Sequence, residues 1–194
     1  MPSRILIVQG HPDPEPGHFG VALANAYADG AREAAHDVRV LEIGRLDFPI
    51  LRSKREWEDS APVECIRRAQ ADIQWSQHLV FCYPLWLGAM PALLKGFLEQ
   101  IARPGFAVPA RDDREHRKLL HGRSARIVVT MGMPALVYRW YFGAHSLKSL
   151  ERNVLGFCGI GPIRESLVGM VENLSPSKRQ QWLQRLRRCG RQAR

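Results

Sequence analysis

The chain has 194 residues, of which 45% are hydrophobic and 24% are charged. This length and composition fit one globular domain over residues 1–194, and they exclude disordered and disulfide-rich classes. No apolar stretch approaches the roughly 20 residues of a membrane span, and the N-terminus has no signal-peptide pattern, so we expect a cytoplasmic protein. The formal net charge of +9 leaves nucleic acid, an anionic membrane surface or an acidic protein open as partners.

Strand-like and helix-like patterns alternate along the chain. Apolar or alternating runs predict strands at residues 4–9, 37–43, 78–83, 126–130 and 163–168. Helical spacing predicts helices at residues 19–35, 62–75, 91–102 and 144–157, and a last one in the tail. Residues 44–61 and 103–123 are predicted to be long loops, with residues 112–115 as a solvated surface run. The alternation predicts an α/β fold: a doubly wound, five-stranded parallel sheet of order 2-1-3-4-5, with helices on both faces.

Most of the net charge belongs to the tail. Residues 175–194 contain seven Lys and Arg and no Asp or Glu, whereas residues 1–97 contain ten basic and twelve acidic residues. Ser175 and Pro176 suit a helix start, and Trp182 and Leu186 recur at helical spacing. We therefore favour a basic terminal helix packed on the domain over a nucleic-acid-binding arm, and a membrane-surface or acidic-protein contact stays open.

In such a sheet, ligands bind at the carboxyl ends of the strands, where the loops after strands 1, 3 and 4 meet. The first loop runs from Gly10 to Gly20; it has neither dinucleotide-fingerprint spacing nor a Walker lysine. Free N–H groups at the start of the following helix favour an anion, with His11 and His18 as side-chain donors. An ordinary proline-rich connection is the equally weighted alternative.

The second and third loops carry aromatic and apolar residues. Trp86, between two prolines at a strand end, suits the face of a planar heterocycle, although a single tryptophan can equally belong to the core. The aromatic cluster at residues 138–142 is predicted to lie in a loop and to line either a ligand pocket or a subunit interface. The seven histidines lack metal-ligand spacing with Cys or carboxylates, so we expect no metal, and Cys82 and Cys158 are predicted to be core residues.

Several blocks together resemble one family. Residues 84–96, which read Pro-Leu-Trp-Leu-Gly-Ala-Met-Pro-Ala-Leu-Leu-Lys-Gly, are close to a block of the flavodoxin-like NAD(P)H:quinone oxidoreductases. That family includes DT-diaphorase and the ancillary oxidoreductases of potassium-efflux antiporters. Residues 104–107, 130–132 and 157–159 fall at the family's later places, so the resemblance covers nearly the whole chain.

The resemblance implies a bound FMN, with FAD as an alternative, and NAD(P)H as co-substrate. Its phosphate contacts fall on His11, Gly17, His18, Phe19 and Gly20. Its ring contacts fall on Pro84, Leu85, Trp86 and Leu87, and its ring-edge contacts on Thr130, Met131, Gly132 and Met133. It also implies that Tyr138 and His145 stabilise the negative charge of the reduced flavin. The family's Ser-x-x-Asn phosphate motif reads Gly17-His18-Phe19-Gly20 here, so side-chain donors are lost.

The function implied is two-electron hydride transfer from NAD(P)H to a quinone or a related small electrophile by a ping-pong mechanism, in a homodimer. The alternative is a cytoplasmic redox-sensing regulatory subunit of a membrane transporter, such as a potassium-efflux antiporter, which would have a membrane-protein partner. A flavodoxin-type electron carrier fits less well, because such a carrier is expected to present an acidic docking surface. No nucleic-acid partner is expected.

Overall fold

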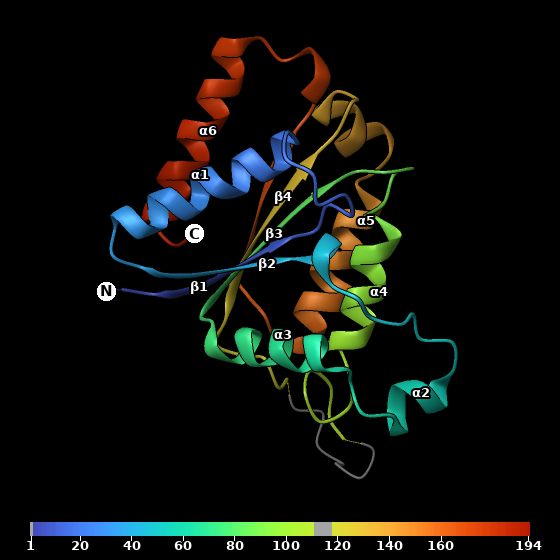
Figure 1. Cartoon of the computed structure of the whole chain (residues 1–194). Coiled ribbons are helices and arrows are strands. Elements are labelled where there is room, and N and C mark those ends of the chain that lie inside the picture. The colour runs from blue at the N-terminus through green and yellow to red at the C-terminus, as the bar shows by residue number, and fades with distance from the viewer. Residues whose placement is uncertain (1, 111–117) are drawn as a thin grey trace.

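A computed structural model describes residues 2–110 and 118–194, so the predicted surface run at residues 112–115 lies outside the described residues. Five parallel strands form one sheet in the order β2-β1-β3-β4-β5, which confirms the predicted topology (Figure 1). The strands are β1 (Arg4–Gln9), β2 (Asp37–Glu42), β3 (His78–Pro84), β4 (Ser124–Thr130) and β5 (Ile163–Val168).

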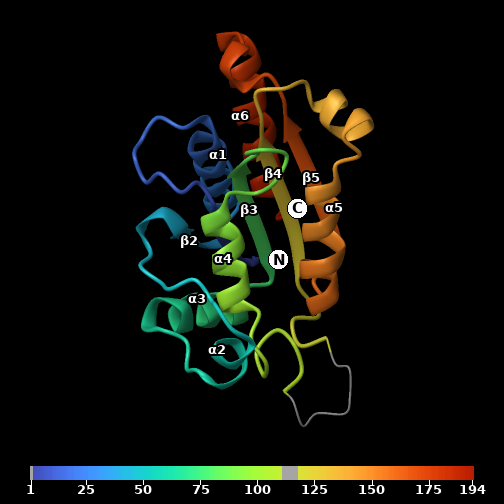
Figure 2. The ribbon, with the colours of Figure 1, turned by 90° about the vertical axis from the view of Figure 1, so that its right-hand side faces the viewer.

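Helices cover both faces of the sheet, as predicted. They are α1 (Phe19–Glu33), α2 (Lys54–Asp59), α3 (Glu64–Trp75), α4 (Ala92–Ile101), α5 (His145–Lys148) and α6 (Pro176–Arg191). α1 and α6 lie on one face, and α3, α4 and α5 lie on the other (Figures 1 and 2). The alternation of side chains along β1 shows why two cores form: Ile5 and Ile7 pack under α1, whereas Leu6 and Val8 join the opposite cluster.

Two segments differ from the sequence-based expectation. Residues 54–59, predicted to be loop, form α2, because the Ser53 hydroxyl accepts from the Glu56 N–H at 3.1 Å and the Glu56 carboxylate accepts from the Arg52 N–H at 2.9 Å. The aromatic segment, also predicted to be loop, is a π-helix over Val137–Tyr141. The helix predicted at residues 144–157 begins as α5 and continues as a π-helix over Ser149–Gly156.

The basic tail is a helix packed against α1, as favoured from its sequence. A Cβ atom on Gly30 would lie 1.9 Å from the Arg187 carbonyl oxygen, and one on Gly190 would lie 2.0 Å from the Tyr27 carbonyl oxygen. Only glycine fits at these two positions, so the two helices cross with their backbones in contact. Glu33 on α1 accepts hydrogen bonds from Arg187 and from Arg191.

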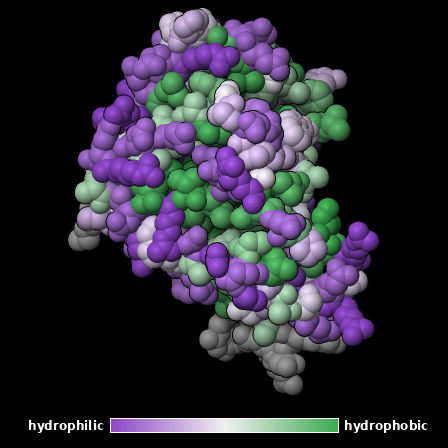
Figure 3. All heavy atoms as spheres, in the orientation of Figure 1, coloured by the Kyte–Doolittle hydropathy of each residue, from purple (hydrophilic) through white to green (hydrophobic). Residues whose placement is uncertain are grey.

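Hydrophilic residues dominate the face of the molecule seen in Figure 3, and a strip of hydrophobic residues interrupts them near β2, the edge strand on which Val40 is exposed. Within the part of the chain that the structure describes, no helix is both long enough and apolar enough to cross a bilayer.

Candidate functional site

The three predicted loops meet at the carboxyl edge of the sheet, at the upper end of the strands in Figure 2. The Gly10 N–H, just after β1, donates to the Cys82 carbonyl on β3 at 2.7 Å. The Leu85 N–H, just after β3, donates to the Thr130 carbonyl at the end of β4 at 2.8 Å. These bonds extend the parallel ladder by one residue past each strand and fix the starting point of each loop.

The start of α1 is an open set of hydrogen-bond donors. The side chain of the N-cap residue His18 makes no capping bond, and the N–H groups of Phe19 and Gly20 have no acceptor among the described residues. The guanidinium of Arg179 lies 4.9 Å from the centre of the Phe19 ring. Free donors, the positive end of the helix dipole and a nearby cation together favour an anion at this helix start.

Thr130 places a hydroxyl beside this helix start. A Cβ atom on Gly20 would lie 3.7 Å from Thr130 Oγ1, so that hydroxyl faces the first turn of α1. Thr130 is 6% exposed, and its hydroxyl has no hydrogen-bond partner among residues 2–110 and 118–194. The thiol of Cys82 donates to the Gly20 carbonyl at 3.0 Å, which ties the helix start to β3. Burial raises the pKa of Cys82 to about 12, so this thiol stays protonated.

The two histidines of the first loop are stacked. The ring centres of His11 and His18 are 3.7 Å apart, and the Nε2 atom of His18 lies 2.9 Å from the Asp13 carboxylate. Burial, followed by the neighbouring His18, lowers the pKa of His11. His11 is therefore a neutral hydrogen-bonding group at pH 7, and the Nε2 atom of His18 has the Asp13 carboxylate as its partner.

Trp86 is a surface residue, not a core residue. Its side chain is 47% exposed, and its ring meets the His11 ring edge-on, with 5.7 Å between the ring centres. The backbone of Trp86 exchanges two hydrogen bonds of 2.9 Å with Ala89, which closes a tight turn. Leu87 and Gly88 at the tip have φ angles of 48° and 77°, so this turn points the leucine into solvent.

The third loop divides its residues between core and surface. Met131 is buried in the cluster under α4 and α5, and its N–H donates to the Val168 carbonyl at 2.9 Å. Gly132 is exposed and Met133 is half-buried. The side chain of Met131 belongs to the core, so the ring-edge contact predicted for this residue remains a prediction for its main chain.

The structure also corrects the role predicted for Tyr138. The side chain is 1% exposed and lies inside the core. Its hydroxyl lies 2.8 Å from the Ser146 hydroxyl and accepts from the Leu147 N–H at 3.3 Å. The phenol is thus occupied within its own segment and cannot reach a ligand at the surface. The π-helical turn is the reason, because it directs Tyr138 inward and its neighbours outward.

Those neighbours form an exposed aromatic patch, which we define as Trp140, Tyr141 and Phe142. Trp140 is 78% exposed and Tyr141 is 82% exposed. His145, at the start of α5, is also exposed, and its imidazole lies over Gly143, where a Cβ atom would come within 2.8 Å of Nε2. The structure therefore brings His145 to the surface but does not bring Tyr138 with it.

Sequence reasoning missed three residues that support the helix start: Cys82 as a donor to Gly20, Asp13 as a partner of His18, and Arg179 over Phe19. Asp13 lies five residues from His18 and was within reach of a local argument. Arg179 comes from the loop-helix junction of α6, so only the packing of α6 on α1 brings it there.

Comparison with known proteins identifies the family of this fold. The sequence model of the family described as the flavodoxin-like fold matches residues 3–189, so the chain belongs to that family. The solved structure of an NAD(P)H:quinone oxidoreductase from Methanothermobacter marburgensis is similar to this one, with a TM-score of 0.82 and 24% identity, covering 98% of this chain and 96% of that one.

Two curated relatives bear related names. A ribosyldihydronicotinamide dehydrogenase-like protein, traD, from Penicillium crustosum is 26% identical over 155 residues, which are 66% of this chain and 57% of that protein. The match therefore spans little more than half of that relative. An FMN-dependent NADH:quinone oxidoreductase from Nitratidesulfovibrio vulgaris (strain DP4) is 24% identical over 181 residues, which cover 86% of each chain.

Proposed function

We propose that this protein is an FMN-dependent NAD(P)H oxidoreductase that acts on quinones or related small electrophiles. One observation carries the proposal: the unpartnered Thr130 hydroxyl faces the uncapped start of α1, and both lie at the strand ends where the loop of Trp86 begins. This arrangement offers donors for a phosphate next to a flat apolar surface for a ring. The names of the relatives and neighbours described above support the same chemistry.

The residues at the site fit FMN. The N–H groups of Phe19 and Gly20 would hold the phosphate, together with the Thr130 hydroxyl and the rings of His11 and His18. Gly17, with a φ angle of 114° and open space where a Cβ would be, leaves room for close approach. Residues 84–87 would lie against the ring, and the main chain of residues 130–133 against its edge.

A bound flavin would supply the two-electron chemistry that allows one site to take a hydride from NAD(P)H and deliver it to an acceptor. The protein would supply orientation and electrostatics. With residues 84–87 against one face of the ring, NAD(P)H and the acceptor would occupy the other face in turn, which is the basis of a ping-pong mechanism. We propose that His145, which is exposed, stabilises the negative charge of the reduced flavin.

We further propose that the protein is a cytoplasmic homodimer. The exposed aromatic patch at residues 140–142 supports dimerisation, because a monomer rarely leaves such side chains in water. A second subunit seated there would cover the patch and would add a wall to the open surface at the strand ends.

The test is reconstitution of the purified protein with FMN and, separately, with FAD. We expect saturable flavin binding, anaerobic bleaching of the bound flavin by NADH or NADPH, and return of its colour with a simple quinone. Failure to bind either flavin would overturn the proposal. Efficient turnover of the isolated protein counts against the regulatory-subunit alternative, which requires a partner.

A further inference from the structure

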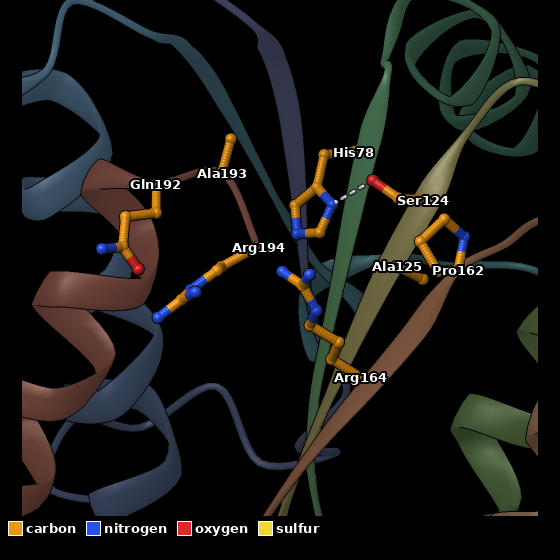
Figure 4. A pocket seen from close by; sticks show the side chains of 8 residues that line it. All are labelled: His78, Ser124, Ala125, Pro162, Arg164, Gln192, Ala193 and Arg194. Carbon is orange, nitrogen blue, oxygen red and sulfur yellow. Dashed lines mark hydrogen bonds between the residues drawn. The ribbon is translucent and has the colours of Figure 1, made fainter.

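A cavity opens at the amino-terminal edge of the sheet, opposite the edge that carries the candidate flavin site. Its volume is about 480 Å³, within the range of small-molecule sites. Figure 4 shows its walls: His78 starts β3, Ser124 starts β4, Arg164 lies on β5, and Gln192 and Arg194 follow the end of α6. The candidate flavin site lies at the other ends of these same strands, so the two sites are separated by the length of the sheet.

The surroundings of this cavity are strongly basic. It shares Arg164 and Arg194 with an adjoining cavity of about 890 Å³, which is also lined by Arg126, Arg185 and Arg188. Glu165 is the carboxylate side chain in these two linings, and it forms an ion pair with Arg139. Among the described residues, Arg164, Arg185 and Arg188 have no ion-pair partner. The positive charge here is thus uncompensated by the protein's own side chains.

Arg126 lines the adjoining cavity and is buried. Its side chain is 5% exposed and donates to the Ser166 hydroxyl at 2.7 Å and to the main-chain oxygen of the last residue, Arg194, at 2.6 Å. Burial lowers the pKa of this guanidinium, because charge is unfavourable in a poorly solvated place.

His78 leaves a hydrogen-bonding atom unused in the same cavity. The residue is 2% exposed; its Nδ1 atom lies 2.7 Å from the Ser124 hydroxyl, and its Nε2 atom has no partner. Figure 4 shows the ring directed into the space between Arg164 and Arg194. Buried polar atoms are normally paired, so an unpaired one that faces a cavity indicates that a group from outside can fill it.

We propose that this cavity binds the phosphate group of a small dissolved compound, at a site separate from the flavin site. Several guanidinium groups around one recess suit a tetrahedral dianion, which accepts hydrogen bonds from several directions. The recess lies among the starts of β3 and β4 and the end of α6, and His78 at its wall is almost fully buried. A dissolved compound can enter such a recess more readily than the headgroup of a packed lipid.

The test uses histidine-side-chain NMR on the whole protein, with FMN present and with FMN absent. Inorganic phosphate and glycerol phosphate are titrated at constant ionic strength, with chloride as the reference anion. We expect a saturable shift of the His78 ring signals with both phosphate compounds, unchanged by FMN. Arg164→Gln should weaken phosphate binding at least about tenfold, because a charge-assisted contact is lost.

Arg187→Gln is the matched control, since it removes the same charge from α6 on the side that pairs with Glu33. It should weaken phosphate binding by no more than about twofold, through long-range screening alone. Arg194→Gln, which removes a second arginine from the lining of the same cavity, serves as a second test variant if Arg164→Gln does not fold. An equal loss in test and control variants would overturn the proposal, as would a chloride response equal to that of phosphate. Binding to vesicles of anionic phospholipid without any response to dissolved phosphate would also overturn it.

Discussion

Tyr138 and Ser146 are joined by a hydrogen bond of 2.8 Å between their hydroxyl groups, which ties the π-helical turn to the start of α5. The Leu147 N–H also donates to the Tyr138 oxygen, so one buried phenol satisfies two groups of α5. This contact sets the orientation of the exposed aromatic patch on the same turn. Tyr138 therefore acts on the surface beside the candidate site only through its neighbours.

Tyr138→Phe is expected to lower the free energy of unfolding by about 1–2 kcal/mol, because two groups lose a buried partner. Ser146→Ala should cost a comparable amount, and the double variant should cost less than the sum, since both remove one interaction. Urea denaturation of the four proteins measures this cycle. FMN affinity and kcat should remain close to those of the unmodified protein. A large loss of kcat without loss of stability would restore a direct role for the phenol.

Thr130→Val tests the phosphate side of the candidate flavin site. The substitution keeps the shape of the side chain and removes the hydroxyl that faces the start of α1. We expect the Kd for FMN to rise about tenfold, because a hydrogen bond to a charged phosphate is lost. Fluorescence titration of FMN measures it, and Thr130→Ser, which keeps the hydroxyl, is the matched control. Equal affinity in all three proteins would exclude this hydroxyl as a phosphate ligand.

His78 is expected to make stability depend on pH. Burial, with Arg126 and Arg164 nearby, lowers the pKa of this imidazole from 6.5 to about 4 in the folded protein. Between these values the unfolded chain binds a proton that the folded chain does not. The neutral His78 therefore contributes its full stabilisation above pH 6.5 and loses it as the pH falls toward 4. The total loss in the free energy of unfolding is about 3 kcal/mol at most.

His78→Asn should remove this pH dependence while leaving an oxygen that the Ser124 hydroxyl can reach. Urea denaturation at pH 7 and at pH 4 should show the unmodified protein losing more stability than the variant. His121→Asn, at an exposed histidine, is the control and should follow the unmodified protein. Parallel losses in all three proteins would mean that His78 titrates normally.

The exposed aromatic patch is expected to mediate dimerisation. Trp140→Glu places a charge where a second subunit would bury the indole, so the dimer Kd should rise at least about a hundredfold, as for the loss of a buried aromatic anchor. Analytical ultracentrifugation measures the change. Ile50→Glu, at an exposed residue of a different loop, is the control and should leave the association unchanged. A dimer that survives Trp140→Glu would place the interface elsewhere.

The sheet was predictable because its signal is local. The apolar runs of β1, β3 and β4 bury both faces, and helical patterns separate them, which leaves few topologies. The cap of α2 was also within reach, because Ser53 and Glu56 have capping-box spacing. The burial of Tyr138 was not predictable, because the helical period decides which residue of an aromatic run points inward. Here the Phe142 N–H donates to the Val137 carbonyl, which is the longer period of a π-helix.

The sequence predicted which loops meet at the candidate site, but it did not predict how their side chains are oriented. Placing Trp86 and Thr130 at one edge followed from strand order, and the exposure of the indole distinguishes a surface role from a core role. The basic cavity was beyond sequence reasoning, because His78, Ser124 and Arg194 are far apart in the chain. The parallel register pairs His78 with Ser124, and the packing of α6 on α1 brings Arg194 beside them.

The close crossing of α1 and α6 also constrains how the protein is made. Tyr27 on α1 is covered in part by Leu186 on α6, and both are fully buried. A ribosome releases α1 before β2 to β5 and before α6, so the apolar side of α1 remains without its cover until all of these elements have been made. The face of the sheet covered by α1 can therefore complete its folding only after α6 has been made. Until then, the apolar surface of α1 that includes Gly30 is exposed and available to chaperones.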